Sequence, residues 1–280
     1  MIPRLTLNKA KYEGAVRQYM RELHKTGVEE LKRQGKLFVE QCIKLTPPYP
    51  QERPLVSTER EQLRVGQGAV IRDLQKLFKP ISKDVKIPRG IQGVQWPKFK
   101  IHGKNPVENA RLQRSIDKYA RAGDTTALDT IFKRLKVRYS GLINQVDAQL
   151  HKMRRNRRGR VTGKKGFFLV SDTDSIEYYL GKKLANIGVA KSGWKKAYYA
   201  LGGKKLSNWI SRHNGAGVYR PGFTNPNLLF VDVGNAVPFI QEAGRELQII
   251  DRARASRARN LAVELKKVQA HLARKWKALR

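Results

Sequence analysis

The excess of basic over acidic residues constrains this chain more than any other feature of its sequence. There are 58 Lys and Arg residues against 23 Asp and Glu, which gives a formal net charge of +35. Repulsion on this scale destabilises a compact monomer unless an anionic partner neutralises it. That partner is a nucleic acid, an anionic membrane or an acidic protein surface, so the composition argues against an ordinary metabolic enzyme.

The hydrophobic content indicates that this polycation folds. Hydrophobic residues make up 40% of the chain and include 4 Trp, 9 Phe and 10 Tyr, which is too many for a disordered polycation. A length of 280 residues fits one large domain or two modest ones, with enough chain to bury a core. Because the basic excess is similar in both halves of the sequence, we expect a folded protein with a basic exterior.

Cysteine content and hydropathy indicate in which kind of cellular compartment the protein resides. The single cysteine, Cys42, excludes an internal disulfide and a thiolate-rich zinc site. The first residues contain no apolar stretch of signal-peptide length, and no uncharged run approaches the roughly 18 residues of a membrane span. We therefore expect no membrane partner and a protein that stays in the compartment where it is made.

Apolar residues at helical spacing predict several helices. The longest runs over about 9–45 and ends at Thr46-Pro47-Pro48, because proline lacks the amide hydrogen and disfavours the α conformation in the residue before it. Asn105 and Asp124 are placed to cap two further helices. The other predicted helices cover 59–78, 107–122, 125–136, 144–155, 174–187, 192–201, 206–213 and 250–279.

Strand signals are fewer than helix signals. The short apolar runs Gly166–Ser171 and Leu228–Val233 predict strands, and the first of them has the pattern of a buried strand. Residues 81–106, rich in Pro and Gly, predict a loop with room for a short hairpin. The sequence therefore predicts an α+β protein.

A strongly basic segment stands out between Lys152 and Lys165, with eight basic residues and no acidic one. Arginine presents forked donors that match phosphate and carboxylate oxygens, although such a run is often only a solvated loop. The C-terminal helix adds more arginines. The residues expected to contact DNA or an acidic partner are Lys152, Arg154, Arg155, Arg157, Arg158, Arg160, Lys164, Lys165, Arg252, Arg254, Arg257 and Arg259.

Signals of catalysis or metal binding are weak. The five histidines stand far apart, without metalloprotease spacing, and Gly66-x-Gly68 lacks the third glycine of a dinucleotide fingerprint. Asp172, Asp174 and Glu177 suit either a magnesium cluster or the start of a helix, where Asp174 and Glu177 have capping-box spacing. Because the capping interpretation is favoured, we expect no enzyme, no metal and no cofactor.

Aromatic residues alternate with basic ones around Trp194, Tyr198, Tyr199 and Trp209. Such residues can stack on single-stranded bases, but packing in a helical core explains them more often. No RNA-recognition, homeodomain, zinc-finger or helix-turn-helix signature accompanies them. We therefore expect these side chains to be part of the core.

Three segments together resemble minor virion proteins of tailed bacteriophages, in particular the tail-completion or head–tail joining family. They are the helix end Phe38–Pro48, the stretch Ile187–Trp194, and Val231–Ile240 ahead of the last helix. The resemblance implies long N- and C-terminal amphipathic helices packed on a small antiparallel sheet that contains both predicted strands. It further implies a core domain composed of residues 1–48 and 161–280, with 49–160 as a largely helical and loop insertion.

The same resemblance implies a structural, non-enzymatic subunit of the virion neck. Its partners would be portal, adaptor or tail subunits, it would be a homo-oligomer or bound to a ring, and DNA would pass nearby. Two alternatives stay open. One is a basic nucleic-acid-binding protein, either DNA-compacting or ribosome-associated, and the other is a nuclease that uses Asp172, Asp174 and Glu177.

Overall fold

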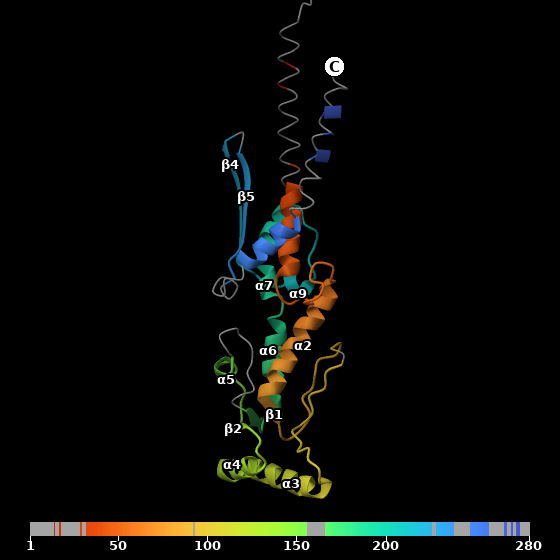
Figure 1. Cartoon of the computed structure of the whole chain (residues 1–280). Coiled ribbons are helices and arrows are strands. Elements are labelled where there is room, and N and C mark those ends of the chain that lie inside the picture. Colours follow the sequence, from red (N-terminus) through yellow and green to blue (C-terminus); the bar gives the residue numbers. More distant parts are fainter. Residues whose placement is uncertain are drawn as a thin grey trace, which may run out of the picture. The chain divides into compact units, whose positions relative to one another are not determined.

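A computed structural model describes most of the chain (Figure 1). The described residues are 32–91, 93–155, 166–225, 228–237 and 247–257, with the isolated positions Gly14, Arg17, Glu29, Lys266, Lys267, Ala270, Ala273 and Arg274. The described residues form α-helices and small sheets, which confirms the α+β class.

The chain divides into two compact units. Unit 1 comprises Met1–Glu59 and Gly188–Arg280, and unit 2 comprises Arg60–Ile187. The expected division instead grouped residues 161–187 with the two ends of the chain. These residues belong to unit 2 because they contain the central strand of its sheet.

Unit 2 is built around a three-stranded parallel sheet in the order β1-β3-β2. Parallel sheets are normally covered on both faces, and this one is. Phe168 and Val170 of β3 pack in one cluster with Leu74 of α2 and Ile176 of α6, while Leu169 packs in a second cluster with α3 and α4. The elements of unit 2 are α2 (Glu59–Leu77), β1 (Phe78–Pro80), α3 (Pro106–Ala122), α4 (Thr125–Arg134), β2 (Tyr139–Ile143), α5 (Ala148–Met153), β3 (Phe167–Val170) and α6 (Thr173–Ala185).

The predicted helix caps of unit 2 are present. The Asn105 side chain accepts hydrogen bonds from the backbone N–H groups of Val107 and Glu108, at 3.1 and 3.3 Å. Asp124 accepts one from Ala127 at 2.9 Å. Local sequence therefore fixed the starts of α3 and α4, since a capping side chain satisfies amides that the helix itself leaves without partners.

Unit 1 combines helices with a two-stranded antiparallel sheet of β4 and β5, which Figure 1 shows as a long pair. Its described helices cover 32–45 and 247–257, and three short ones lie between them in sequence. The buried side chains of unit 1 include Cys42, Trp194, Ile210 and Ala253. The remaining elements of unit 1 are α7 (Val189–Ser192), α8 (Lys195–Ala200), α9 (Asn208–Ser211), β4 (Gly217–Asn225) and β5 (Leu228–Asn235).

The two predicted strands lie in different sheets, which corrects the expectation of one antiparallel sheet. β3 pairs in parallel with β1 and β2, whereas β5 pairs with β4. The sequence showed no signal for β1, β2 or β4. β1 directly follows a long helical pattern, β2 has only two apolar residues in its last two positions, and β4 contains two glycines and a proline, so none has a clear alternating or apolar pattern.

Several helices in the structure differ in extent from the predicted helices. The predicted helix over 144–155 is reduced to α5, and the one over 192–201 is replaced by α7 and α8, which are separate elements. Within the described part of 81–105 no strand is assigned, so the hairpin expected there is absent. The first helix ends at residue 45, as predicted from the prolines. The part of that prediction before residue 32 lies, apart from three isolated positions, outside the described residues, as does most of the last helix beyond 257.

Candidate functional site

The end of the helix over 32–45 is joined to the segment 187–194 by buried hydrogen bonds within unit 1. The Thr46 hydroxyl donates to the Cys42 carbonyl at 2.7 Å and accepts from the Trp194 indole N–H at 2.8 Å. The Lys191 ammonium donates to the Ile43 carbonyl. Four of these five side chains are fully buried, and Ile43 is 4% exposed, so two segments that carry the virion-protein resemblance share one core.

The third segment, Val231–Ile240, contacts the segment 187–194 through Asn235, the last residue of β5. Its side-chain amide donates to the Ala190 carbonyl at 2.8 Å, and its side-chain oxygen accepts from the Val237 N–H at 3.1 Å. Asn235 lies so close to Gly193 that a Cβ there would stand 1.9 Å from the Asn235 side-chain oxygen. The three segments therefore form one interlocked cluster in unit 1, which we call the junction cluster: Cys42, Ile43, Thr46, Ala190, Lys191, Gly193, Trp194, Asn235 and Val237.

Lys191 is the unusual member of the junction cluster because it carries an ionisable amine and is nevertheless fully buried. Burial of the amine lowers the pKa of Lys191 to about 7, and the Glu59 carboxylate opposes only part of this shift. Its hydrogen-bond partner lies in the last turn of a helix, where carbonyl groups lack partners within the helix and favour a cation. Nothing in the sequence pattern separates Lys191 from the many exposed lysines, so this burial could not be predicted.

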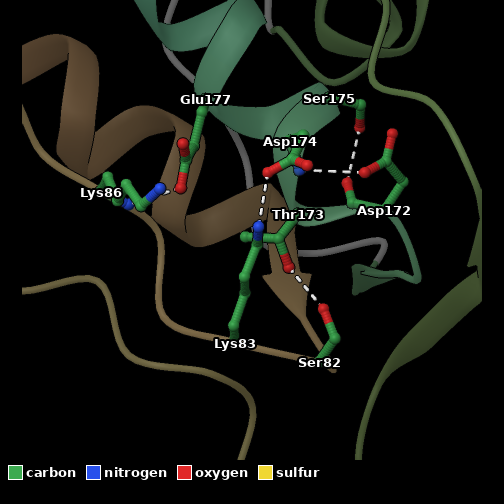
Figure 2. A network of polar contacts seen from close by, with 8 residues as sticks. All are labelled: Ser82, Lys83, Lys86, Asp172, Thr173, Asp174, Ser175 and Glu177. Atoms are coloured by element: carbon green, nitrogen blue, oxygen red, sulfur yellow. Dashed lines mark hydrogen bonds and ion pairs between the residues drawn. The ribbon is translucent and has the colours of Figure 1, made fainter.

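The acidic residues at the start of α6 act as helix-capping and pairing groups (Figure 2). Asp172 is the N-cap, and its carboxylate accepts from the Asp174 N–H at 3.0 Å. The Ser175 hydroxyl donates to the Asp172 carbonyl at 2.8 Å. The favoured capping interpretation is confirmed, with the cap at Asp172 rather than at Asp174.

The other two carboxylates bind partners in the loop after β1 (Figure 2). Asp174 forms an ion pair with Lys83 at 2.7 Å, which lowers the pKa of Asp174 and raises that of Lys83. Glu177 accepts from the Lys86 backbone N–H at 2.8 Å, so it does not complete a capping box. Across the described ranges no group of three His, Cys, Asp or Glu residues is arranged to hold a metal ion.

The basic segment is described only at its beginning, where Lys152, Arg154 and Arg155 differ in exposure. Lys152 is exposed, but Arg154 is only 9% exposed and its guanidinium lies 4.8 Å from the centre of the Phe168 ring. Arg155 lies 3.9 Å from the Asp73 carboxylate. Arg154 is therefore a packing residue of unit 2 rather than an exposed contact for a partner. The candidates Arg157, Arg158, Arg160, Lys164 and Lys165 lie outside the described residues.

His151 is buried next to this segment. Its Nδ1 lies 3.1 Å from the Tyr179 hydroxyl and its Nε2 lies 3.2 Å from the Arg155 guanidinium. Burial, with smaller contributions from the Arg155 and Lys183 cations, lowers the pKa of His151 to about 4. A neutral ring with an acceptor nitrogen toward Arg155 fits this arrangement, so His151 belongs to the packing of unit 2.

The arginines of the helix over 247–257 belong to unit 1, whereas the basic segment belongs to unit 2. Arg252 donates to the Tyr49 hydroxyl at 3.1 Å, Arg254 lies 4.0 Å from the Asp251 carboxylate, and Arg257 donates to the Gln34 side chain. Arg252 and Arg254 are exposed, and Arg257 is half-buried. The last candidate, Arg259, lies outside the described residues.

The aromatic residues and the paired glycines are packing groups. Trp194, Tyr198 and Trp209 are at least nine-tenths buried, which confirms the core interpretation, while Tyr199 is 39% exposed. Gly66 and Gly68 are buried positions inside α2. A phosphate-binding loop would need this segment to lie between a strand and a helix, which it does not.

Unit 2 also has a basic groove that the sequence does not predict. It has a volume of about 430 Å³ and lies between residues 98–103 and α3. Its charged lining residues, Lys98 and Lys100, are isolated in the sequence, so a search for runs of basic residues passes over them. The lining residues are Lys98, Lys100, Ile101, His102, Gly103, Pro106, Asn109, Ala110 and Gln113.

Comparison of this chain with protein-family models, curated proteins and solved structures found no match. Within the part of the chain that the structure describes, no helix is both long enough and apolar enough to span a membrane.

Proposed function

We propose that this chain is a structural virion protein of a tailed bacteriophage, a tail-completion or head–tail connector subunit of the neck. The observation that carries the proposal is the junction cluster. Three segments that resemble the family are far apart in sequence, yet they are joined by buried hydrogen bonds through Thr46, Lys191 and Asn235. An arrangement in one core is what the resemblance requires of these segments.

The proposal includes the finer arrangement of unit 1. In this arrangement the first and last long helices pack with the antiparallel β4–β5 pair, which contains only the second of the two predicted strands. Three contacts bear on this packing. Arg257 of the last helix donates to Gln34 of the first. Asn235 at the end of β5 donates to Ala190 of α7, and Lys191 of α7 donates to Ile43 of the first helix.

In this role the protein binds other virion proteins and has no catalytic residue or cofactor. Portal, adaptor or tail subunits are the partners, the chain forms a homo-oligomer or joins a ring, and it resides in the virion. The charge of +35 supports an assembled state, because acidic protein surfaces or passing DNA relieve the repulsion between like charges.

Site-specific labelling of the assembled particle tests the location. Val56 of unit 1 is 79% exposed and Cys42, the single native cysteine, is fully buried. The variant Val56→Cys therefore accepts a gold-labelled maleimide at one accessible thiol, and the unsubstituted protein is the control. In electron micrographs of particles encoded by the same genome, we expect gold at the neck. Gold that is absent from the neck and tail, or present on the capsid shell, contradicts the proposal.

A basic nucleic-acid-binding protein is the second candidate, and the exposed cations of unit 2 favour it. This candidate requires the isolated chain to bind nucleic acid tightly and to lose that binding when Arg157, Arg158 and Arg160 are replaced by Gln. Arg154 is left unchanged in this variant because its stacking on Phe168 supports the fold. Binding that survives the triple substitution argues against the basic segment as the contact.

A further inference from the structure

The exposed face of α3 carries a stripe of four cations. Arg111, Arg114, Lys118 and Arg121 follow one another at steps of three, four and three residues, which places them on one side of an α-helix. All four side chains are exposed, whereas Ile116 and Ala120 on the opposite side are buried in the core of unit 2. The stripe extends over about 15 Å along the helix axis.

The basic groove runs beside this stripe. Arg114 folds back along α3, with its Nε 3.4 Å from the carbonyl of Ala110, a lining residue of the groove. Lys98 and Lys100 line the groove from the extended segment on its other side. The groove and the stripe therefore form one continuous surface, which we call the α3 surface: Lys98, Lys100, Arg111, Arg114, Lys118 and Arg121.

Hydrogen bonds hold the two walls of the groove in place. The Gln113 side-chain oxygen accepts from the Ile101 N–H at 2.9 Å, and its amide donates to the Asp117 carboxylate at 2.9 Å. Asp84 accepts from the Lys98 backbone N–H at 2.7 Å. The backbone that carries Lys98 and Lys100 is thus fixed against α3, while neither ammonium group forms an ion pair with any described residue.

Little negative charge offsets the α3 surface. Over 98–121 there are seven basic residues and two acidic ones, Glu108 and Asp117. The Asp117 carboxylate is engaged by Gln113, and among the described residues no ion pair involves a cation of the α3 surface. A groove whose cations have no ionic partner in the described part of the chain is suited to a repeating array of anions.

We propose that the α3 surface binds the phosphate backbone of double-stranded DNA without reading its sequence. Single-stranded nucleic acid is bound largely by stacking of bases on exposed aromatic rings. The aromatic residue of this wall, Phe99, packs against Phe132 and Phe167 with ring centres 5.8 and 5.3 Å away. The surface therefore offers charge rather than a stacking platform. This proposal rests on the fold of unit 2 and stands independently of the neck assignment.

The salt dependence of binding by the full-length chain tests the proposal. We use fluorescence anisotropy with a labelled DNA duplex of random sequence and compare the wild type with the variant Lys98→Gln, Lys100→Gln, Arg111→Gln, Arg114→Gln. Each phosphate contact contributes about 0.9 to the slope of log affinity against log salt. We expect the variant to reduce that slope by about 3 to 4, which corresponds to a loss of about 10²-fold in salt sensitivity between about 50 and 200 mM.

A matched control removes the same charge elsewhere on unit 2. The variant Arg72→Gln, Lys76→Gln, Lys133→Gln, Arg134→Gln also replaces two Lys and two Arg residues that are exposed. We expect it to leave the slope nearly unchanged. An equal reduction in both variants means that only total charge matters, and it overturns the proposal. So does a wild-type chain that fails to bind duplex DNA.

Other polyanions identify the ligand. Duplex DNA should bind better than single-stranded DNA of equal length, and polyglutamate should compete poorly. If polyglutamate competes as well as DNA, and the quadruple substitution weakens its binding too, the surface binds an acidic protein instead. That result overturns the proposal. If the quadruple variant unfolds, the pairs Lys98/Lys100 and Arg111/Arg114 are replaced separately, and each should lower the slope by about 2.

Discussion

Gly188 and Gly193 occupy positions in unit 1 that no larger residue fits. A Cβ on Gly188 would lie 2.1 Å from the Trp209 carbonyl oxygen, and the residue has a φ of +105°, which favours glycine. A Cβ on Gly193 would overlap the Asn235 side chain of the junction cluster. Both glycines lie in the segment 187–194, and close packing allows no side chain at either position.

Replacing Gly188 with Ala should destabilise unit 1 by about 3 kcal/mol or more, because overpacking adds to an unfavourable backbone conformation. Gly202→Ala is the control. Gly202 has a φ of +78° and no atom within 4 Å of its ideal Cβ position, so only the conformational cost of about 1 to 2 kcal/mol applies. Urea unfolding measures both free energies. Equal losses in the two variants would show that the contact with Trp209 is unimportant.

Lys191 should make the stability of unit 1 depend on pH. The pKa of Lys191 is about 7 in the folded protein and 10.5 ordinarily. Between these two pH values the unfolded chain holds a proton on Lys191 that the folded chain lacks. Stability therefore rises with pH through this window, by on the order of a few kcal/mol. Lys191→Met removes that rise, whereas Lys204→Met, at an exposed position, keeps it. The measurement is the free energy of unfolding in urea at several pH values, and parallel curves for wild type and Lys191→Met contradict the prediction.

At the scale of elements, local signals defined helix ends better than they defined sheets. The caps Asn105 and Asp124 and the prolines after residue 45 set boundaries that the structure retains. A capping bond involves residues two or three positions apart, so it is visible in the sequence. Strand pairing joins distant residues, such as Phe78 and Phe168, and the sequence carries no record of which strands will meet.

Asp172→Ala should destabilise α6 and unit 2 by about 0.5 to 2 kcal/mol, the usual cost of removing an N-cap. Asp174→Asn should cost less than Asp172→Ala, because its ion pair with Lys83 is exposed and screened by solvent. Thermal unfolding with and without magnesium distinguishes capping from metal binding. We expect no change in the midpoint on adding magnesium. A magnesium-dependent increase that disappears in Asp174→Asn would restore the nuclease alternative.

At the scale of the whole molecule, net charge should govern stability. With 58 basic and 23 acidic residues, repulsion between like charges opposes folding at low ionic strength, and salt screens it. The midpoint of thermal unfolding should therefore rise between about 10 mM and 150 mM salt, where the screening length falls from about 30 to 8 Å. Unfolding that is insensitive to salt over this range means that repulsion does not limit the isolated chain.

The sequence by itself determined the net charge, the α+β class, the first helix end and the capped helices, because each depends on composition or on residues close together in the chain. Only the tertiary structure decided that Arg154 packs on Phe168, that Lys191 is buried, and that Lys98 and Lys100 line a groove beside α3. The reason is physical: exposure and pairing of a charged side chain depend on distant segments brought beside it by folding, and the identity of the residue alone does not encode them.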